Sequence, residues 1–215
     1  MSVVKWVAGG WVLFTLENVV LSENRTRLIE LLGGTKNYHF VFNLTSSAAL
    51  LSIAFGYWKY GPGKVRSVSG PAKWMGAVCV ACGAGLLSQL GSRDSSGIRG
   101  VSRITRHPQL YGIGLVGLGL ALRSPFSGRR ALFSGPLGVA LVGTHHQDSR
   151  FRRGIGGQLS PEKDLKSPNL PFAAFLSGTH EWSDLKELEL KPLLVGVLGS
   201  QAALLTMSKL VRRKS

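Results

Sequence analysis

The stretch RITRHPQLYGIGLVGLGLAL, residues 103–122, joins a basic segment directly to an apolar one. From His107 to Leu122 it has sixteen consecutive residues without a formal charge. A transmembrane helix needs about 20 mostly apolar residues, with about 17 as the lower bound, so this run is short for a span. Pro108 suits the first position of a helix, where its missing N–H removes no hydrogen bond. The stretch therefore predicts a helix that begins at Pro108 and enters a membrane just after two arginines.

Similar apolar runs recur along the chain. The others are residues 3–21, 40–58, 74–92, 131–147 and 192–208. Only the first of these contains formal charges, at Lys5 and Glu17. Each run is long enough to cross a hydrocarbon layer or nearly so. The sequence therefore predicts an all-α fold, a polytopic membrane helix bundle with about six transmembrane helices.

The connectors fit one membrane domain over residues 1–215. Residues 22–37 carry apolar side chains at helical spacing and include Gly33, a natural helix C-cap, so we expect a short interfacial helix after the first span. Residues 148–191 form the one long polar connecting segment, with seven basic and seven acidic residues. Residues 209–215, KLVRRKS, form a basic C-terminal tail.

Composition and charge narrow the partners. Hydrophobic residues make up 44% of the chain and charged residues only 17%, and the net charge is +15. The basic residues are scattered between apolar runs and are not gathered on one recognition element. We therefore expect anionic lipid headgroups and other membrane-protein subunits as partners, and no nucleic acid.

The basic segment is the first candidate site. Arg103, Arg106, His107 and Tyr111 lie at the start of the predicted helix, where unpaired N–H groups and the helix dipole attract anions. Two interpretations are open here. The residues either mark a membrane boundary or bind a phosphate, a carboxylate or an acidic cofactor.

Polar residues elsewhere give weaker candidates. Glu17 and Asn18 lie inside the first predicted span, where a carboxylate is costly and faces protein or a cavity, unless the span ends there. The weak ligand candidates are His39, His145, His146 and Asp148. Adjacent histidines on a helix point about 100° apart and seldom bind one ion, so we predict no metal site and no catalytic residue.

Three segments resemble the NnrU family of polytopic membrane proteins, which includes 15-cis-zeta-carotene isomerase. They are ENRTRLIELLGGTKNYHFVFNLTSSAAL (23–50), ITRHPQLYG (104–112) and HHQDSRFRRGIGGQLSPEKDLKSPNLPFAAFLSG (145–178). They follow one another in the family's order, and the second is nearly the hallmark of the family. The resemblance implies a multi-pass membrane domain.

The isomerase branch of that family binds haem b through two histidines, and this chain departs from it at both positions. By the resemblance, one ligand position falls at Glu17 or Asn18 and the other at Leu120, with the accompanying cysteine at Gly117. Leucine cannot ligate iron, and Glu or Asn matches haem poorly. The resemblance thus implies a family member without haem, unless other histidines serve as replacement ligands.

The string RHPQLYG is also similar to the RHP-x-Y-x-G motif of membrane methyltransferases. That resemblance implies that Arg106, His107 and Tyr111 hold S-adenosylmethionine. The acidic pair that follows in those enzymes is reduced to Asp148 here.

Three functions follow, and the first is our preferred expectation. It is a haem-free, non-catalytic accessory subunit of an organellar membrane complex that contacts lipid headgroups. By analogy with small basic subunits of respiratory complexes, the mitochondrial inner membrane is favoured, with a plastid membrane as the alternative. The second is an active haem-dependent isomerase or redox enzyme that uses His39, His107, His145 or His146. The third is an S-adenosylmethionine-dependent methyltransferase.

Overall fold

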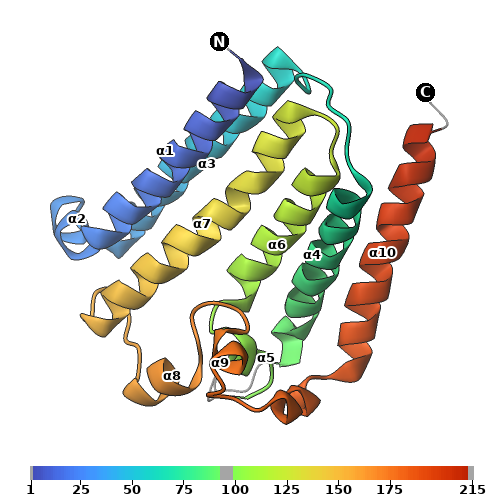
Figure 1. Ribbon diagram of the computed structural model, residues 1–215. Helices are drawn as coiled ribbons and strands as arrows, with labels where there is room; N and C mark the ends of the chain where they lie inside the picture. The colour runs from blue at the N-terminus through green and yellow to red at the C-terminus, as the bar shows by residue number, and fades with distance from the viewer. Residues whose placement is uncertain (1, 93–98, 213–215) are drawn as a thin grey trace. The chain divides into compact units, whose positions relative to one another are not determined.

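The computed structural model describes residues 2–92 and 99–212, and all regular elements in this part are helices (Figure 1). In chain order they are α1 (Val3–Glu23), α2 (Arg25–Leu31), α3 (Thr35–Tyr60), α4 (Gly70–Ser88), η1 (Gln89–Ser92), α5 (Val101–Ile104), α6 (Pro108–Arg123), α7 (Ser127–Arg152), α8 (Pro161–Lys166), α9 (Ala173–Leu176), η2 (Trp182–Glu187) and α10 (Leu190–Arg212). Over these residues the sole β pairing is an isolated bridge between Val65 and Phe126. The predicted all-α class is confirmed for the described residues.

Three helices are long and apolar enough to cross a membrane, namely Val3–Glu23, Thr35–Tyr60 and Gly70–Gly91. All six predicted apolar runs are helical, but α6 has only 16 residues, and α10 contains an apolar helical stretch over Leu190–Thr206 that is shorter than 18 residues. Six spans therefore stay a prediction. In the most apolar 18-residue part of Val3–Glu23 only 17% of the residues are buried. Surface of this kind requires lipid or a protein partner around it.

Contacts divide the chain into two compact units, and each unit consists of two separate chain segments. The first unit contains Met1–Ser67 and Ser124–Ser160, and the second contains Val68–Arg123 and Pro161–Ser215. The chain therefore passes from the first unit to the second, back to the first and again to the second.

In the first unit, α1 packs between α3 and α7 through tryptophan side chains that lie over glycines. The Trp6 indole donates from Nε1 to the Ser52 carbonyl of α3 at 2.8 Å. The Trp11 indole donates to the Leu132 carbonyl of α7 at 3.1 Å. A Cβ atom on Gly56 or Gly135 would overlap these rings. Indole N–H groups that find backbone acceptors can be buried without loss, and the glycines give them room.

In the second unit, α4 lies between α6 and α10, and its contact with α6 is made by glycines. A Cβ atom on Gly76 would lie 2.7 Å from the Gly119 carbonyl oxygen, and one on Gly83 would lie 2.6 Å from the Gly112 carbonyl oxygen. Helices approach this closely only where side chains are absent. The abundance of glycine in the sequence thus has a packing role at this contact.

The connectors agree with the sequence at α2 and differ after α7. At the end of α2, Gly33 has φ 74°, and Gly34 N–H donates to the Ile29 carbonyl at 2.8 Å. This is a glycine-dependent C-terminal cap of the kind predicted. Helix α7 continues to Arg152, beyond the predicted end of its span, because the polar residues after Gln147 remain helical. Of the basic tail, residues 209–212 belong to α10 and residues 213–215 lie outside the described residues.

Candidate functional site

The basic segment forms a sharp turn between α5 and α6. Helix α5 ends at Ile104, and the next residue, Thr105, caps it with an extended backbone, with φ −163° and ψ 146°. The Thr105 hydroxyl accepts a hydrogen bond from His107 N–H at 3.2 Å and donates to the Asn169 carbonyl at 2.5 Å. Helix α6 then begins at Pro108, as predicted. Because of this turn, Arg103 and Arg106 both contact the segment that precedes α10.

Arg106 is buried and ion-paired. The residue as a whole is 8% exposed. Its Nη1 donates to Asp164 Oδ1 of α8 at 2.7 Å. Its backbone N–H donates to the Pro168 carbonyl at 2.9 Å. A buried guanidinium requires such a partner, because a charge removed from water is costly unless it is paired.

Arg103 binds two carboxylates of η2. Its Nε and Nη2 atoms donate to the two Glu187 carboxylate oxygens at 3.0 and 3.1 Å, and Nη1 donates to Asp184 Oδ2 at 3.2 Å. Gly100 N–H, at the start of α5, also donates to Glu187 at 2.8 Å. Arg103 and Arg106 thus form ion pairs with carboxylates of the same chain.

Tyr111 completes the set from the first turn of α6. Its hydroxyl donates to Asn169 Oδ1 at 2.9 Å. His107 is half-buried beside it, and the His107 carbonyl accepts the Tyr111 N–H at 3.1 Å. We call the residues that join α5 and α6 to residues 161–187 the polar latch. Its members are Arg103, Thr105, Arg106, Tyr111, Asp164, Asn169, Asp184 and Glu187.

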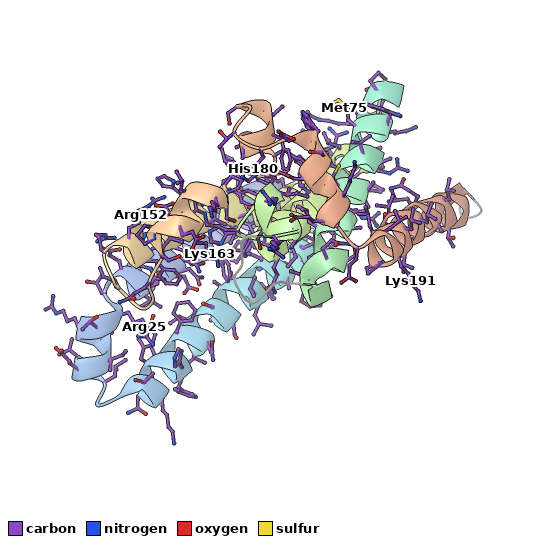
Figure 2. The ribbon with its side chains drawn as sticks, turned by 90° about the horizontal axis from the view of Figure 1, so that it is seen from below. Arg25, Met75, Arg152, Lys163, His180 and Lys191 are labelled. Carbon is purple, nitrogen blue, oxygen red and sulfur yellow. The ribbon has the colours of Figure 1, made fainter. Side chains whose placement is uncertain are left out.

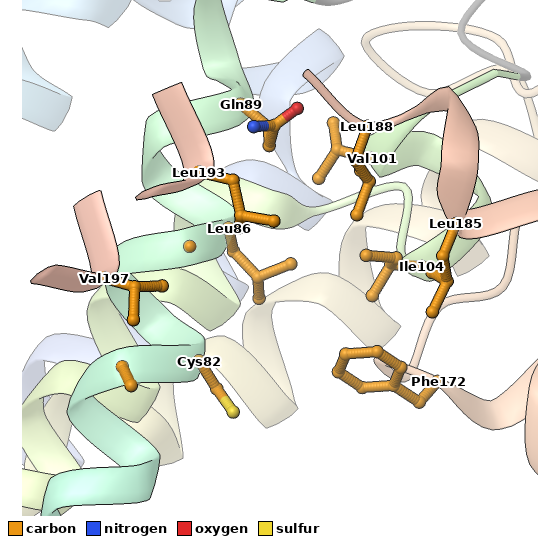
Figure 3. A pocket seen from close by; sticks show the side chains of 12 residues that line it. Cys82, Leu86, Gln89, Val101, Ile104, Phe172, Leu185, Leu188, Leu193 and Val197 are labelled. Atoms are coloured by element: carbon orange, nitrogen blue, oxygen red, sulfur yellow. The ribbon is translucent and has the colours of Figure 1, made fainter. Parts of the chain in front are cut away.

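Neighbours of the latch residues in the chain, such as Ile104 and Leu185, line an apolar cavity of about 260 Å³ (Figure 3). Its walls include Leu86 of α4, Ile104 of α5, Leu193 of α10 and Phe172. Phe172 has a left-handed backbone, with φ 62°, which is rare for a bulky residue and marks local strain. The cavity is somewhat smaller than the roughly 300–1,000 Å³ usual for small-molecule sites. An apolar group such as the end of a hydrocarbon chain fits this volume and lining.

Gln89 is the one polar side chain in the lining, and backbone groups satisfy it. Its Nε2 donates to the Glu189 carbonyl at 2.9 Å, and its Oε1 accepts from Glu189 N–H at 3.0 Å. Such a paired amide fixes the start of α10 against the end of α4. It therefore contributes to the architecture of the cavity.

Glu187 makes the latch sensitive to acid. The pKa of this carboxyl lies below its ordinary value, first because Arg103 donates hydrogen bonds to it. A depressed folded-state pKa stabilises the protein above the unfolded value of about 4.3, and this stabilisation is lost as pH falls through the folded pKa. We expect hydrogen exchange at residues 182–189 to be slower in the wild type than in Arg103→Gln at pH 7. The ratio of the variant's exchange rate to that of the wild type should fall toward one as the pH is lowered through the folded-state pKa of Glu187, below about 4.3. A ratio that is unchanged over that range would contradict the role of Glu187.

The polar pair of the first span lies inside α1, which continues to Glu23 and does not end at Glu17. Asn18 Nδ2 donates to the Phe14 carbonyl at 2.8 Å, and it also contacts Glu17 Oε1 at 3.3 Å and Ser46 Oγ of α3 at 3.4 Å. Both side chains are half-buried. Their described contacts join α1 to α3 within the first unit.

The weak ligand candidates are spread over α3 and α7. His39 and His145 are exposed, and Asp148 is buried. His146 is half-buried and its Nε2 lies 3.2 Å from Ser22 Oγ. Within residues 2–92 and 99–212, no group of three or more His, Cys, Asp or Glu side chains is arranged to hold a metal ion.

The positions that the resemblance assigns to haem ligands do not fit haem in this chain. Leu120 and Gly117 lie within α6, and neither side chain has a donor atom for iron. The amide of Asn18 is engaged with α1 and α3, and Glu17 accepts one of its hydrogen bonds. These four positions therefore lack the pair of imidazoles that holds haem in the isomerase branch.

Sequence reasoning identified the basic half of the latch and missed its acidic half. Asp164, Asn169, Asp184 and Glu187 lie 58 to 84 residues from their partners. The one signal for them was the balance of acidic and basic residues in the segment 148–191. The reading of the RHP string as a methyltransferase motif stays a prediction.

Comparison with protein families gives a match that covers most of the chain. The model of the family described as NnrU protein matches residues 7–208. No curated protein and no solved structure matches the chain. A match over this length, together with apolar helices long enough to cross a membrane, shows that the chain belongs to the NnrU family of membrane proteins.

Proposed function

We propose that this NnrU protein is a haem-free, non-catalytic accessory subunit of an organellar membrane complex. The observation that carries the proposal is the polar latch. Arg106 and Tyr111 are two of the residues of the RHP string that would hold a cofactor, and Arg103 lies just before that string. Each of these three bonds to a side chain of residues 161–187. Polar groups engaged in this way stabilise a fold and are not displayed toward a substrate.

The surface supports a role within an assembly of protein and lipid. Large apolar side chains are exposed along the membrane helices. They include Leu13 and Leu16 of α1, Phe40 and Trp58 of α3, and Leu198 of α10. Lipid tails or neighbouring subunits would cover them, and a net charge of +15 suits anionic headgroups at the membrane boundary. We favour the mitochondrial inner membrane, with a plastid membrane as the alternative.

The test is the state of the protein extracted from its own membrane in a mild detergent. We expect a tagged chain to migrate with a larger complex on a native gel and to copurify with other membrane subunits identified by mass spectrometry. Migration as a lone 23.1 kDa chain in its detergent micelle would contradict the accessory role.

Two spectroscopic and calorimetric outcomes would favour the alternatives. A Soret band that survives washing would favour a haem enzyme with replacement histidine ligands. Saturable binding of S-adenosylmethionine that is lost in His107→Ala would favour a methyltransferase. We expect neither.

A further inference from the structure

A buried arginine at the end of the first unit has no carboxylate partner. Arg150, in the last turn of α7, is only 9% exposed. Its Nη1 donates to the Ser22 carbonyl at the end of α1 at 2.9 Å, and its Nε is buried without a hydrogen-bond partner. The pKa of Arg150 is lowered, chiefly because burial penalises the charged form. Nη1 also lies 3.5 Å from the Ile155 carbonyl oxygen. Backbone carbonyls carry only partial charges and do not neutralise a guanidinium, so the buried Arg150 side chain favours the binding of an anion.

A second arginine lies beside it. Arg25 starts α2, and a Cβ atom on Gly156 would lie 3.1 Å from Arg150 Nη1 and 3.1 Å from Arg25 Cδ. Both arginines therefore border the same glycine. In the described part of the chain neither makes a salt bridge. The charge of Arg25 disfavours the charged form of Arg150, and two like charges that act on each other repel unless an anion lies between them.

The carboxylate of Glu23 acts on Arg150 through its charge, but it binds another arginine. Both oxygens of Glu23 bind Arg153, with distances of 2.6 and 2.9 Å to Nη1 and Nη2. This fork-to-fork pair uses the geometry that a guanidinium and a carboxylate share best. Glu23 therefore bonds directly to Arg153 and acts on Arg150 only through its charge. In the described part of the chain, Arg25 and Arg150 have no directly bonded carboxylate.

The two arginines line a cavity of about 170 Å³ at the level where α1 ends and α3 begins. Figure 2 shows Arg25 on α2 at the end of this unit where α7 ends near Arg152. Tyr38 and His39, from the first turns of α3, add polar groups to the lining, and Phe42 closes it on the apolar side. The dipole of α3 has its positive end here. The cavity thus combines cationic and polar groups with the aromatic side chains of Phe42 and Phe151.

We propose that this cavity binds a phosphate group, either the headgroup of an anionic phospholipid or a free phosphate. Two guanidinium groups on different elements offer more N–H donors than the two oxygens of a carboxylate can accept, whereas a phosphate offers at least three oxygens. The position at the end of two helices that can cross a membrane suits a lipid headgroup. The site is separate from the polar latch and does not depend on the proposed accessory role.

The test is a binding titration of the purified, delipidated protein in detergent, in which native mass spectrometry measures the bound ligand. The probes are short-chain phosphatidic acid, inorganic phosphate, and a short-chain diacylglycerol that lacks the phosphate. We expect one phosphatidic acid per chain, bound at least about tenfold more weakly by Arg25→Gln, because one charge-assisted contact is lost. Arg27→Gln, on the exposed side of the same helix, is the matched control and should bind like the wild type.

The outcomes separate the two sources of phosphate. Phosphatidic acid that binds much more tightly than inorganic phosphate identifies a lipid, and equal binding of the two identifies free phosphate. Arg150→Lys, which keeps the charge but not the guanidinium geometry, should weaken either probe. The proposal is overturned if no phosphate probe binds, if diacylglycerol binds as well as phosphatidic acid, or if Arg25→Gln and Arg27→Gln behave alike. The native gel reports assembly and this titration reports bound phosphate, so the two proposals can fail separately.

Discussion

Replacement of Gly83 by alanine is expected to lower the free energy of unfolding by about 2–3 kcal/mol. The new Cβ atom would lie 2.6 Å from the Gly112 carbonyl oxygen and 2.8 Å from the Val116 backbone nitrogen. These are backbone atoms of α6, so no side-chain rotation can relieve the overlap and the two helices must separate. The loss exceeds the roughly 1 kcal/mol that alanine gains over glycine inside a helix. Thermal or denaturant unfolding in detergent, followed by circular dichroism, measures the effect.

Gly199→Ala is the matched control. Gly199 is also inside a helix of the second unit, α10, but no atom lies within 4 Å of the position of its Cβ. Here the helix preference of alanine acts alone, so stability should rise by up to about 1 kcal/mol. Equal effects of the two substitutions would show that the glycine contact between α4 and α6 contributes nothing specific.

Arg106→Gln is expected to lower the unfolding free energy by about 2–3 kcal/mol. The substitution removes a buried guanidinium from Asp164, whose carboxylate it contacts at 2.7 Å. We place the loss below the largest values for buried pairs because the Asp164 side chain is 30% exposed, and water solvates part of its charge. The same unfolding measurement applies, and protease digestion should cut residues 161–187 faster in the variant.

Helix α8 supplies the control for this second experiment. Lys166 and Glu162 form an ion pair at 2.9 Å, but both side chains are more than half exposed. Lys166→Gln should therefore change stability by less than about 0.5 kcal/mol. A double-mutant cycle of Arg106→Gln with Asp164→Asn isolates the pair itself. If the Arg106→Gln protein were as stable as the wild type but retained less lipid, the result would favour binding of an external anion by the RHP string over a structural role in the latch.

Much of the helical layout was predictable because uncharged runs in a membrane protein must be helical to satisfy their backbone. All six runs became helices, and the start of α6 at Pro108 and the glycine cap of α2 followed from local chemistry. The end of α7 at Arg152 did not follow, since a helix can continue through polar residues once it leaves the apolar layer.

The candidate sites were less predictable because they depend on residues far apart in the chain. The sequence marks Arg106 as a cation at the start of a helix, but nothing local shows that Asp164 meets it. The sequence does not predict a binding role for Arg150, because it is one of several basic residues that follow the apolar part of α7. Its special position comes from burial against Ser22, which only the fold provides.

The alternation of the two units along the chain has a consequence for biosynthesis. The partner of α1 and α3 within the first unit is α7, which the ribosome produces only after α4 and α6 have emerged. Until α7 is made, the surfaces of α1 and α3 that pack against it therefore remain uncovered. A nascent chain that stops before residue 124 contains neither unit in full.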